Sequence, residues 1–241
     1  MCTLSWWRDG TTYGVFFNRD ESRTRLKAEI PCRFETRGIS YLSPVDTDGG
    51  GTWIWANSQG MIGCLLNNYQ VKREGAANPV SRGLLLKSLA SHRDTESFFD
   101  AVKMTDLRTY RGFLIFGMDL KTHGLITWNY DNLQFSSEGD VCSPITSSGY
   151  LPEEIMSHRK NLYNSRFDTV SSPSPEELFS YHTFHDPALP AHSVLMSRAD
   201  ARTVSLSQVW VDPERIRFSY GTVSEQCRPD GPTTISLNRV D

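Results

Sequence analysis

The chain has 241 residues, a net charge of −3, and 38% hydrophobic and 11% aromatic residues. One domain of this length buries roughly 70–75% of its unfolded surface, so we expect a single domain over residues 1–241. Basic and acidic residues are mixed along the chain, which argues against a nucleic-acid partner and against binding to an anionic membrane. The longest apolar runs are too short to span a bilayer, so no integral membrane segment is expected.

The cysteines indicate a reducing compartment. Their number is odd, and no two form a CxxC pair, which argues against a disulfide framework and against a thiolate zinc site. The first residues also lack the charged and apolar regions of a secretory signal. We therefore expect a cytoplasmic protein with the free cysteines Cys2, Cys32, Cys64, Cys142 and Cys227.

A β-hairpin is expected at the start of the chain. Residues 2–8 and 12–17 have strand-forming sequences, and Asp9-Gly10 between them is a two-residue turn signal. The second strand leads directly into Asn18-Arg19-Asp20-Glu21. Because the hairpin returns the chain to its starting level, these polar residues should lie beside Cys2.

The remaining elements alternate in blocks. Residues 21–38 are polar and are expected to form a connection. Alternating apolar residues predict strands over 52–57, 61–67, 113–118, 125–130, 193–197, 203–211 and 215–220. Apolar residues at helical spacing and helix-start signals predict helices over 81–91, 95–104, 152–166 and 174–181. Runs of strands separated by runs of helices predict packed antiparallel sheets with helices outside. A four-layer αββα sandwich fits this order.

Cys2 is the candidate nucleophile. Removal of Met1 leaves Cys2 with a thiol and a free α-amine on the same residue. Such an amine titrates near 7.7–8.0, roughly, so it can serve as a general base for its own thiol. An adjacent Arg19 favours the thiolate, and Asp20 can orient the amine. The alternative is that residues 18–21 are only a polar loop leaving the sheet.

Several short motifs carry a resemblance to a known family. Met1-Cys2-Thr3, Asn18-Arg19-Asp20-Glu21, Gly50-Gly51-Thr52-Trp53, Asn68-Tyr69 and Ser81-Arg82-Gly83 occur in the order typical of the NRDE family, also called the transport-and-Golgi-organisation protein two family. The resemblance is continuous over residues 1–83. It implies an N-terminal-nucleophile (Ntn) hydrolase fold, related to the cysteine acylases that cut penicillin V or bile-salt amides.

The resemblance also implies roles for individual residues. It makes Cys2, Arg19, Asp20 and Asn68 catalytic, with the Asn68 amide as an oxyanion donor, and places Asn18, Thr52, Trp53, Tyr69 and Arg82 at the substrate. The chain departs from the acylases in two places. Asp20 directly follows Arg19, where the acylases have two intervening residues, so Glu21 or neither acid takes that role. Hydroxyls in Thr146-Ser147-Ser148 replace a second Asn.

Other motifs keep an ordinary interpretation beside a functional one. Asn67-Asn68 can simply form a turn, and Arg82 can be solvated rather than bind a substrate carboxylate. Trp53 and Trp55 are expected to point to opposite faces of their strand, one into the core and the other into the pocket. The glycine tract opens a strand rather than a helix, which argues against a phosphate loop. A possible metal-binding group, His182, His185, Asp186 and His192, lies at a helix end and in a proline-containing loop, where no common ligand geometry is set. Neither a metal nor a cofactor is therefore expected.

The leading hypothesis is an N-terminal-cysteine hydrolase or acyltransferase acting on an amide or thioester of a small molecule. The alternative is a non-catalytic carrier or trafficking protein that binds a hydrophobic ligand, such as an acyl-CoA, lipid or haem, in the same pocket. The two differ in whether Met1 is removed.

Overall fold

Two antiparallel sheets form the centre of the computed structural model, which describes residues 1–70, 79–168 and 172–240. The six-stranded sheet has the order β10 (Ile145–Ser147), β1 (Cys2–Asp9), β2 (Thr12–Ser22), β11 (Ala201–Val211), β12 (Arg215–Thr222) and β13 (Thr233–Asn238). The seven-stranded sheet follows chain order: β3 (Glu29–Thr36), β4 (Ile39–Val45), β5 (Ile54–Asn57), β6 (Ile62–Asn67), β7 (Phe113–Met118), β8 (His123–Trp128) and β9 (Leu133–Ser137).

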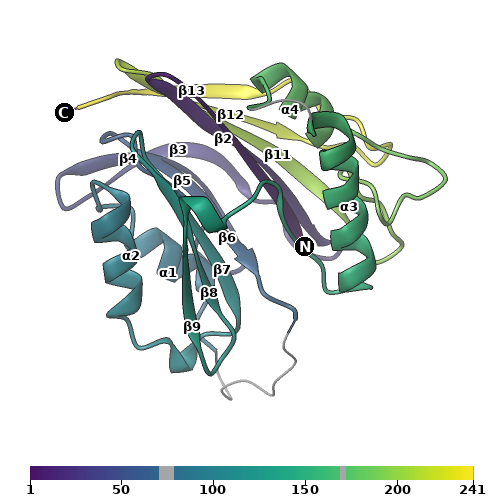
Figure 1. The fold of residues 1–241 in the computed structure, drawn as a ribbon, viewed down its shortest axis with the longest axis horizontal. Coiled ribbons are helices and arrows are strands. Elements are labelled where there is room, and N and C mark those ends of the chain that lie inside the picture. The colour runs from purple at the N-terminus through teal and green to yellow at the C-terminus, as the bar shows by residue number, and fades with distance from the viewer. Residues whose placement is uncertain (71–78, 169–171, 241) are drawn as a thin grey trace.

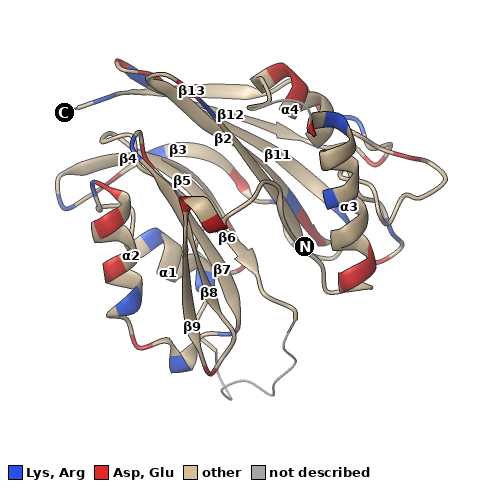
Figure 2. Ribbon diagram, viewed as in Figure 1, with Lys and Arg blue, Asp and Glu red and all other residues tan. Residues whose placement is uncertain are grey.

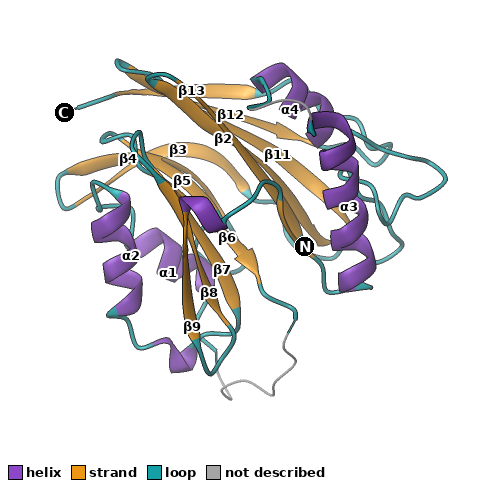
Figure 3. Ribbon diagram, in the orientation of Figure 1, coloured by secondary structure: helices purple, strands orange, loops and turns teal. Residues whose placement is uncertain are grey.

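Helices cover the outer face of each sheet (Figures 1 and 3). α1 (Arg82–Ser88) and α2 (Thr95–Lys103) lie on the seven-stranded sheet, and α3 (Pro152–Phe167) and α4 (Pro175–His182) lie on the six-stranded sheet. Two short 3₁₀ turns, η1 (Leu107–Thr109) and η2 (Glu138–Asp140), join elements. The expected αββα sandwich is confirmed.

Apolar side chains fill the space between the sheets because each strand turns alternate residues inward. Leu4 and Phe17 from the six-stranded sheet meet Ile54, Leu66 and Phe116 from the other in one buried cluster. Two further clusters lie under the helices, one beneath α1 and α2 and one beneath α3 and α4. In Figure 2, basic and acidic segments are scattered over the helices and turns of both halves.

Several elements differ from the sequence-based expectation. Residues 29–36, predicted as part of a polar connection, form β3, which is an edge strand and therefore carries polar, exposed side chains and tolerates Pro31. Residues 193–197, predicted as a strand, form a buried loop whose amides donate to other loop carbonyls, such as Leu195 to Phe184. The strands β4, β9, β10 and β13 were not predicted.

The most consequential difference is the length of β2. It continues to Ser22, so the segment Asn18–Glu21 lies inside the strand and not in a loop beyond it. Strand alternation then sends Arg19 and Asp20 to opposite faces of the sheet. Among the described residues, no helix has the length and apolar composition to cross a membrane, and all five cysteines are free.

Candidate functional site

Cys2 lies at the centre of a row of three paired residues. It is opposite Arg19 of β2 on one side and opposite Ser147 of β10 on the other. Residues paired across antiparallel strands point to the same face of a sheet. All three therefore point into the space between the sheets, and Cys2 is only 8% exposed.

A cavity of about 450 Å³ opens at this row. Its walls come from both sheets and from the start of α1. The residues predicted from the sequence that line it are Cys2, Arg19, Asp20, Glu21, Thr52, Trp53, Tyr69 and Arg82. The structure thus brings together most of the predicted site, with Asn18 and Asn68 as the exceptions.

Arg19 is held in place by contacts on several sides. Its Nη2 atom lies 3.2 Å from Glu21 Oε1 and 3.2 Å from Asp46 Oδ1. Its guanidinium carbon is 4.3 Å from the centre of the Trp53 ring, a cation–π contact. Arg25 binds the second oxygen of Asp46 at 2.5 Å. Arg19 is therefore a fixed, charge-balanced side chain in the cavity wall.

The two tryptophans of the glycine-rich segment face opposite ways, as expected, but not because of strand alternation, which turns residues two apart to the same face. Trp53 precedes β5, and only Trp55 lies within the strand. Trp53 faces the cavity, and Trp55 faces the helices, where its Nε1 donates to the carbonyl of Leu86 at 2.7 Å. Thr52 lines the cavity and its amide donates to Gly83 O at 3.1 Å. A Cβ at Gly51 would lie 2.2 Å from the Gly83 carbonyl carbon, so this glycine permits a close backbone approach.

Asn18 was expected at the substrate, and the structure places it on the other face of the sheet. Its Nδ2 donates to the carbonyls of His182 and Val194, and its Oδ1 lies 2.8 Å from His182 Nδ1. Ser5 Oγ is 2.7 Å from His182 Nε2. All three side chains are fully buried under α4, so Asn18 anchors that helix. The physical reason is again the alternation along β2.

This Ser5–His182–Asn18 chain also explains one of the histidines considered for metal binding. Burial, together with the charge of Arg159, lowers the pKa of His182 to about 3. The ring is therefore neutral, with Nδ1 donating to Asn18 and Nε2 accepting from Ser5. His192 lies elsewhere, 2.7 Å from Glu154 Oε1. Within the described residues, no group of three or more His, Cys, Asp or Glu is arranged to hold a metal ion.

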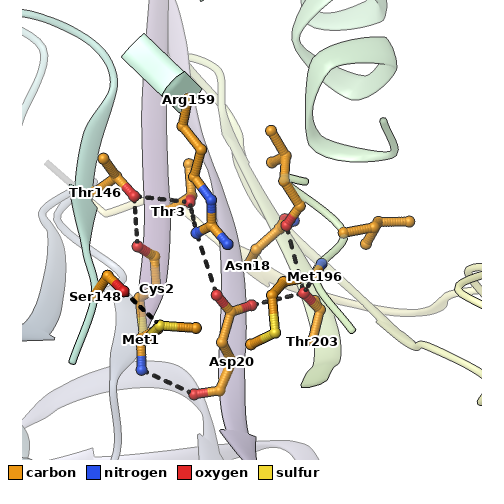
Figure 4. Close-up of polar contacts among 12 residues, drawn as sticks. Met1, Cys2, Thr3, Asn18, Asp20, Thr146, Ser148, Arg159, Met196 and Thr203 are labelled. Atoms are coloured by element: carbon orange, nitrogen blue, oxygen red, sulfur yellow. Dashed lines mark hydrogen bonds and ion pairs between the residues drawn. The ribbon is translucent and has the colours of Figure 1, made fainter. Parts of the chain in front are cut away.

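Asp20 also points toward the helices. Its Oδ2 lies 3.2 Å from Arg159 Nη1, and its Oδ1 accepts from Thr203 Oγ1 at 2.6 Å (Figure 4). The backbone of Asp20 pairs with Met1 instead: the Asp20 amide donates to Met1 O at 3.0 Å, and the Met1 ammonium donates to Asp20 O at 3.2 Å. The Asp20 carboxylate is thus engaged behind the sheet, while Glu21 shares the cavity face with Arg19.

The neighbouring residues Asn67 and Asn68 differ in whether they line the Cys2 cavity. Asn68 does not line the Cys2 cavity: its Nδ2 donates to Trp128 O at 3.2 Å and its Oδ1 accepts from the Gln70 amide at 3.1 Å. Asn67 does line it, and donates from Nδ2 to Tyr69 Oη at 2.8 Å. The position of an Asn at this strand end was predictable, but the choice between the two neighbours was not.

Ser147 is a site residue that the sequence marked only as a departure. Its Oγ is buried and has no hydrogen-bond partner in the described part of the chain. It lines a second cavity of about 510 Å³, which shares Asn67 and Tyr69 with the first. Thr146 turns the other way and donates to Cys2 O at 3.3 Å. A buried hydroxyl without a partner is available to a ligand.

Arg82 reaches the cavity from the first turn of α1. Its Nη1 donates to Gly112 O at 2.8 Å, which orients the guanidinium. Burial lowers its pKa, and the neighbouring charge of Arg111 acts in the same direction. The side chain remains a cation, since an arginine pKa stays far above neutrality.

Ionisation of the site depends on the chain terminus. With Met1 attached, burial raises the pKa of the Cys2 thiol to about 11; the terminal ammonium lowers it, and Asp20 and Glu21 raise it. Burial lowers the pKa of the Met1 amine, but the charges around it outweigh this and raise that pKa overall. In the Met1-bearing chain Cys2 is therefore a neutral thiol at pH 7. Activation of the thiol by Arg19 stays a prediction for the chain that begins at Cys2.

Comparisons with known proteins identify the family of the chain and the kind of fold. The sequence model described as "Transport and Golgi organisation 2" matches residues 1–227. No curated protein sequence matches. Two structures of variants of the conjugated bile acid hydrolase of Clostridium perfringens are similar in fold: each has a TM-score of 0.52 and 12% identity, with coverage of 99% of this chain and 98% of that chain for one, and 98% and 92% for the other.

A Caenorhabditis elegans protein gives a further structural match. This orthologue of N-acylethanolamine-hydrolyzing acid amidase has a TM-score of 0.59 and 9% identity, over 86% of this chain and 92% of that chain. At such low identity these likenesses show the fold alone, an Ntn-hydrolase-like sandwich.

Proposed function

The chain belongs to the Transport and Golgi organisation 2 family, and from this premise we propose that it is an N-terminal-cysteine amidohydrolase or acyltransferase. The observation that carries the proposal is the position of Cys2, which begins a central strand and lines a cavity between the sheets. An Ntn-hydrolase-like fold is the scaffold in which such a terminal residue does chemistry. The protein that reacts is the form without Met1.

In the proposed reaction, the Cys2 α-amine takes the thiol proton and the sulfur attacks the acyl carbon of an amide or thioester. The tetrahedral intermediate collapses to an acyl-thioester on Cys2, and the amine returns the proton to the leaving group. Water, deprotonated by the same amine, then releases the carboxylic acid and restores the thiol. A second nucleophile in place of water gives acyl transfer.

Two residues can donate to the developing oxyanion: one lines the cavity of Cys2, and the other pairs with Cys2 in the sheet. Asn67 Nδ2 lies in the cavity wall, where it now bonds Tyr69 Oη, and Ser147 Oγ is buried without a partner in the described residues. We assign these two in place of Asn68, whose amide is committed to Trp128 and Gln70. Each such donor contributes about 2.7–4 kcal/mol of transition-state stabilisation in known enzymes.

The other cavity residues bind and shape the substrate. Arg82 is placed to pair with an acidic group, while Thr52, Trp53 and Tyr69 form the walls. Arg19 fixes the cavity wall beside the nucleophile. Asp20 contributes from the far side of the sheet and not as a direct partner of the amine. The described lining contains four arginines and three acidic residues, which suits a polar substrate better than the hydrophobic ligand of a carrier.

The test begins with defined N-termini. Protein beginning at Cys2 is prepared by proteolytic removal of a fusion tag, and Met1-bearing protein by direct expression, with intact mass confirming each. A panel of simple acyl amides and thioesters is then screened for hydrolysis. We expect activity in the Cys2-first form only, with a mass increase of one acyl group trapped on Cys2.

Matched variants decide the result. Cys2→Ala should abolish hydrolysis and acylation, whereas Cys32→Ser, which changes an exposed cysteine, should leave both unchanged. Iodoacetamide should also label Cys2 faster in the Cys2-first form than in the Met1-bearing form. Hydrolysis that survives Cys2→Ala would sink the proposal, as would a Cys2-first protein that is neither acylated nor alkylated faster than its Met1-bearing counterpart.

A further inference from the structure

One guanidinium behind the six-stranded sheet contacts two strands at the level of Cys2. Arg159 of α3 is fully buried, and its Nη1 donates to Thr3 Oγ1 at 2.8 Å and lies 3.2 Å from Asp20 Oδ2 (Figure 4). Thr3 follows Cys2 in β1, and Asp20 follows Arg19 in β2. Because side chains alternate along a strand, Thr3 and Asp20 point toward the helices and contact Arg159, whereas Cys2 and Arg19 point into the cavity.

Hydroxyl groups extend this contact to the two flanking strands. On β11, Thr203 Oγ1 donates to Asp20 Oδ1 at 2.6 Å. On β10, Thr146 Oγ1 lies 3.2 Å from Thr3 Oγ1 and donates to the Cys2 carbonyl at 3.3 Å. A β-bulge between Thr203 and Ser205 shifts the register of β11 at this level. Four adjacent strands are thus joined around Arg159.

The charge pair at the centre is an unusual way to stabilise a fold. The side chains of Arg159 and Asp20 are both 0% exposed. Removing two charges from water costs free energy that their attraction often fails to recover, so a buried pair is weak evidence for stability. Arg159 Nη2 is also buried without a hydrogen-bond partner among the described residues. A role toward the neighbouring strand ends, which carry Cys2 and Arg19, explains the Arg159–Asp20 pair better than a contribution to stability does.

Cys2 is surrounded by charges from several elements. Asp20 and Glu21 of β2 disfavour its thiolate, whereas the terminal ammonium favours it. The other ionisable groups around it are Arg19 on β2, Cys64 on β6, Tyr69 beyond β6 and Arg82 on α1. Of the two acids, Asp20 has its carboxylate beside Arg159, and Glu21 has its carboxylate beside Arg19.

We propose that Arg159 is a positioning residue for Cys2: from the helical side of the sheet it fixes the strand ends that present Cys2 and Arg19, and it cancels the Asp20 charge there. The inference deepens the proposed function, in which Cys2 is the nucleophile. It concerns the thiol itself, however, so its test needs no substrate and can fail while an acyl hydrolase activity stands, or hold while none is found.

The test measures the rate of Cys2 alkylation by iodoacetamide at pH 9, by peptide mass spectrometry, on proteins with the same N-terminus. Arg159→Met leaves Asp20 uncompensated, and we expect alkylation about threefold slower. Asp20→Asn removes the charge that disfavours the thiolate, and we expect alkylation about threefold faster. These factors correspond to a change of about one pKa unit, partly offset because a less basic thiolate is a weaker nucleophile.

Opposite signs are the decisive readout, because simple loosening of the strand ends would expose Cys2 and speed both variants. The double variant should return to within about twofold of wild type, and Arg159→Lys, which keeps the charge, should stay close to wild type. If Arg159→Met does not fold, Arg159→Gln serves in its place. Leu178→Ala, in the apolar cluster under the same helices, is the control for destabilisation alone. Equal rates in all variants, shifts of the same sign, or slowing by Arg159→Lys or Leu178→Ala equal to that by Arg159→Met would each overturn the proposal.

Discussion

Arg19 lies in β2 of the six-stranded sheet and Trp53 immediately precedes β5 of the other sheet, and the Arg19 guanidinium carbon lies 4.3 Å from the centre of the Trp53 ring. The contact joins the two layers directly beside Cys2. It places a cation in the cavity wall without exposing it, since Arg19 is only 4% exposed. The integrity of the site and the packing of the two sheets are therefore linked at this pair.

The first prediction concerns this contact. Trp53→Leu should lower the free energy of unfolding by about 2–4 kcal/mol, because it removes both buried aromatic area and the cation–π attraction. Trp53→Phe keeps a ring under Arg19 and should lose less. Urea unfolding measures both. Equal losses in the two variants would show that the contact with Arg19 contributes nothing beyond buried area.

The two neighbouring asparagines should behave differently. Asn68→Ala strands the buried carbonyl of Trp128 and removes the acceptor of the Gln70 amide, so we expect a loss of about 1–3 kcal/mol of stability. Asn67→Ala should change thermal stability less and lower the rate of acyl hydrolysis more. Thermal unfolding and the hydrolysis assay on the Cys2-first protein give the comparison. The reverse order of effects would return the oxyanion role to Asn68.

Stability should depend on pH through His182. Its pKa of about 3 in the folded protein lies below the ordinary value of about 6.5 in the unfolded chain. The folded state therefore binds fewer protons in that interval, so stability is complete above about pH 6.5 and falls as the pH is lowered toward 3. The slope from this group approaches about 1.4 kcal/mol per pH unit.

A variant isolates that contribution. His182→Gln removes the titrating ring, so its stability curve should be flatter than that of wild type between pH 6.5 and pH 4, although its stability at pH 7.5 is lower. Chemical unfolding at each pH provides the curves. Parallel curves for the two proteins would mean that His182 is not held neutral.

Close backbone packing should make Gly51 intolerant of a side chain. A Cβ there would lie 2.2 Å from Gly83 C and 2.5 Å from Leu84 N, so Gly51→Ala must push α1 away from the cavity rim. We expect a loss of about 1–3 kcal/mol by overpacking. Gly139→Ala is the matched control, because its Cβ would meet nothing within 4 Å. Thermal unfolding distinguishes the two, and similar midpoints would contradict the close approach.

Local sequence signals were sufficient for the layered architecture and for the hairpin that begins the chain. The turn signal at Asp9-Gly10 correctly predicted a hairpin that returns residues 18–20 to the level of Cys2. The turn itself lies one residue later, at Gly10-Thr11, because Asp9 pairs with Thr12, and this register sets Arg19 opposite Cys2. The end of β2 was placed too early, at residue 17, because a run of polar residues resembles a loop. That single error hid the fact that Asn18 and Asp20 face the helices.

Contacts that depend on distant segments left no local signal. Arg159 lies in a helix with many polar residues, and nothing in the neighbouring sequence shows that it reaches Asp20 and Thr3 across the sheet. Nothing in the sequence around Ser147 shows that it lies opposite Cys2, because that position follows from the pairing of β10 with β1. Such residues are found only when the packing of the layers is known.

The paired backbone groups of Met1 and Asp20 carry one more consequence. Loss of the initiator residue would shorten the β1–β2 ladder by one rung, because each of the two residues donates to the other there. Trimming the chain would thus release an amide and a carbonyl of Asp20 next to the newly formed ammonium. It would also empty the place where the Met1 sulfur lies 2.8 Å from Ser148 Oγ. Removal of Met1 would therefore change the hydrogen bonds at the end of β1 and β2, in addition to freeing the Cys2 α-amine as a base.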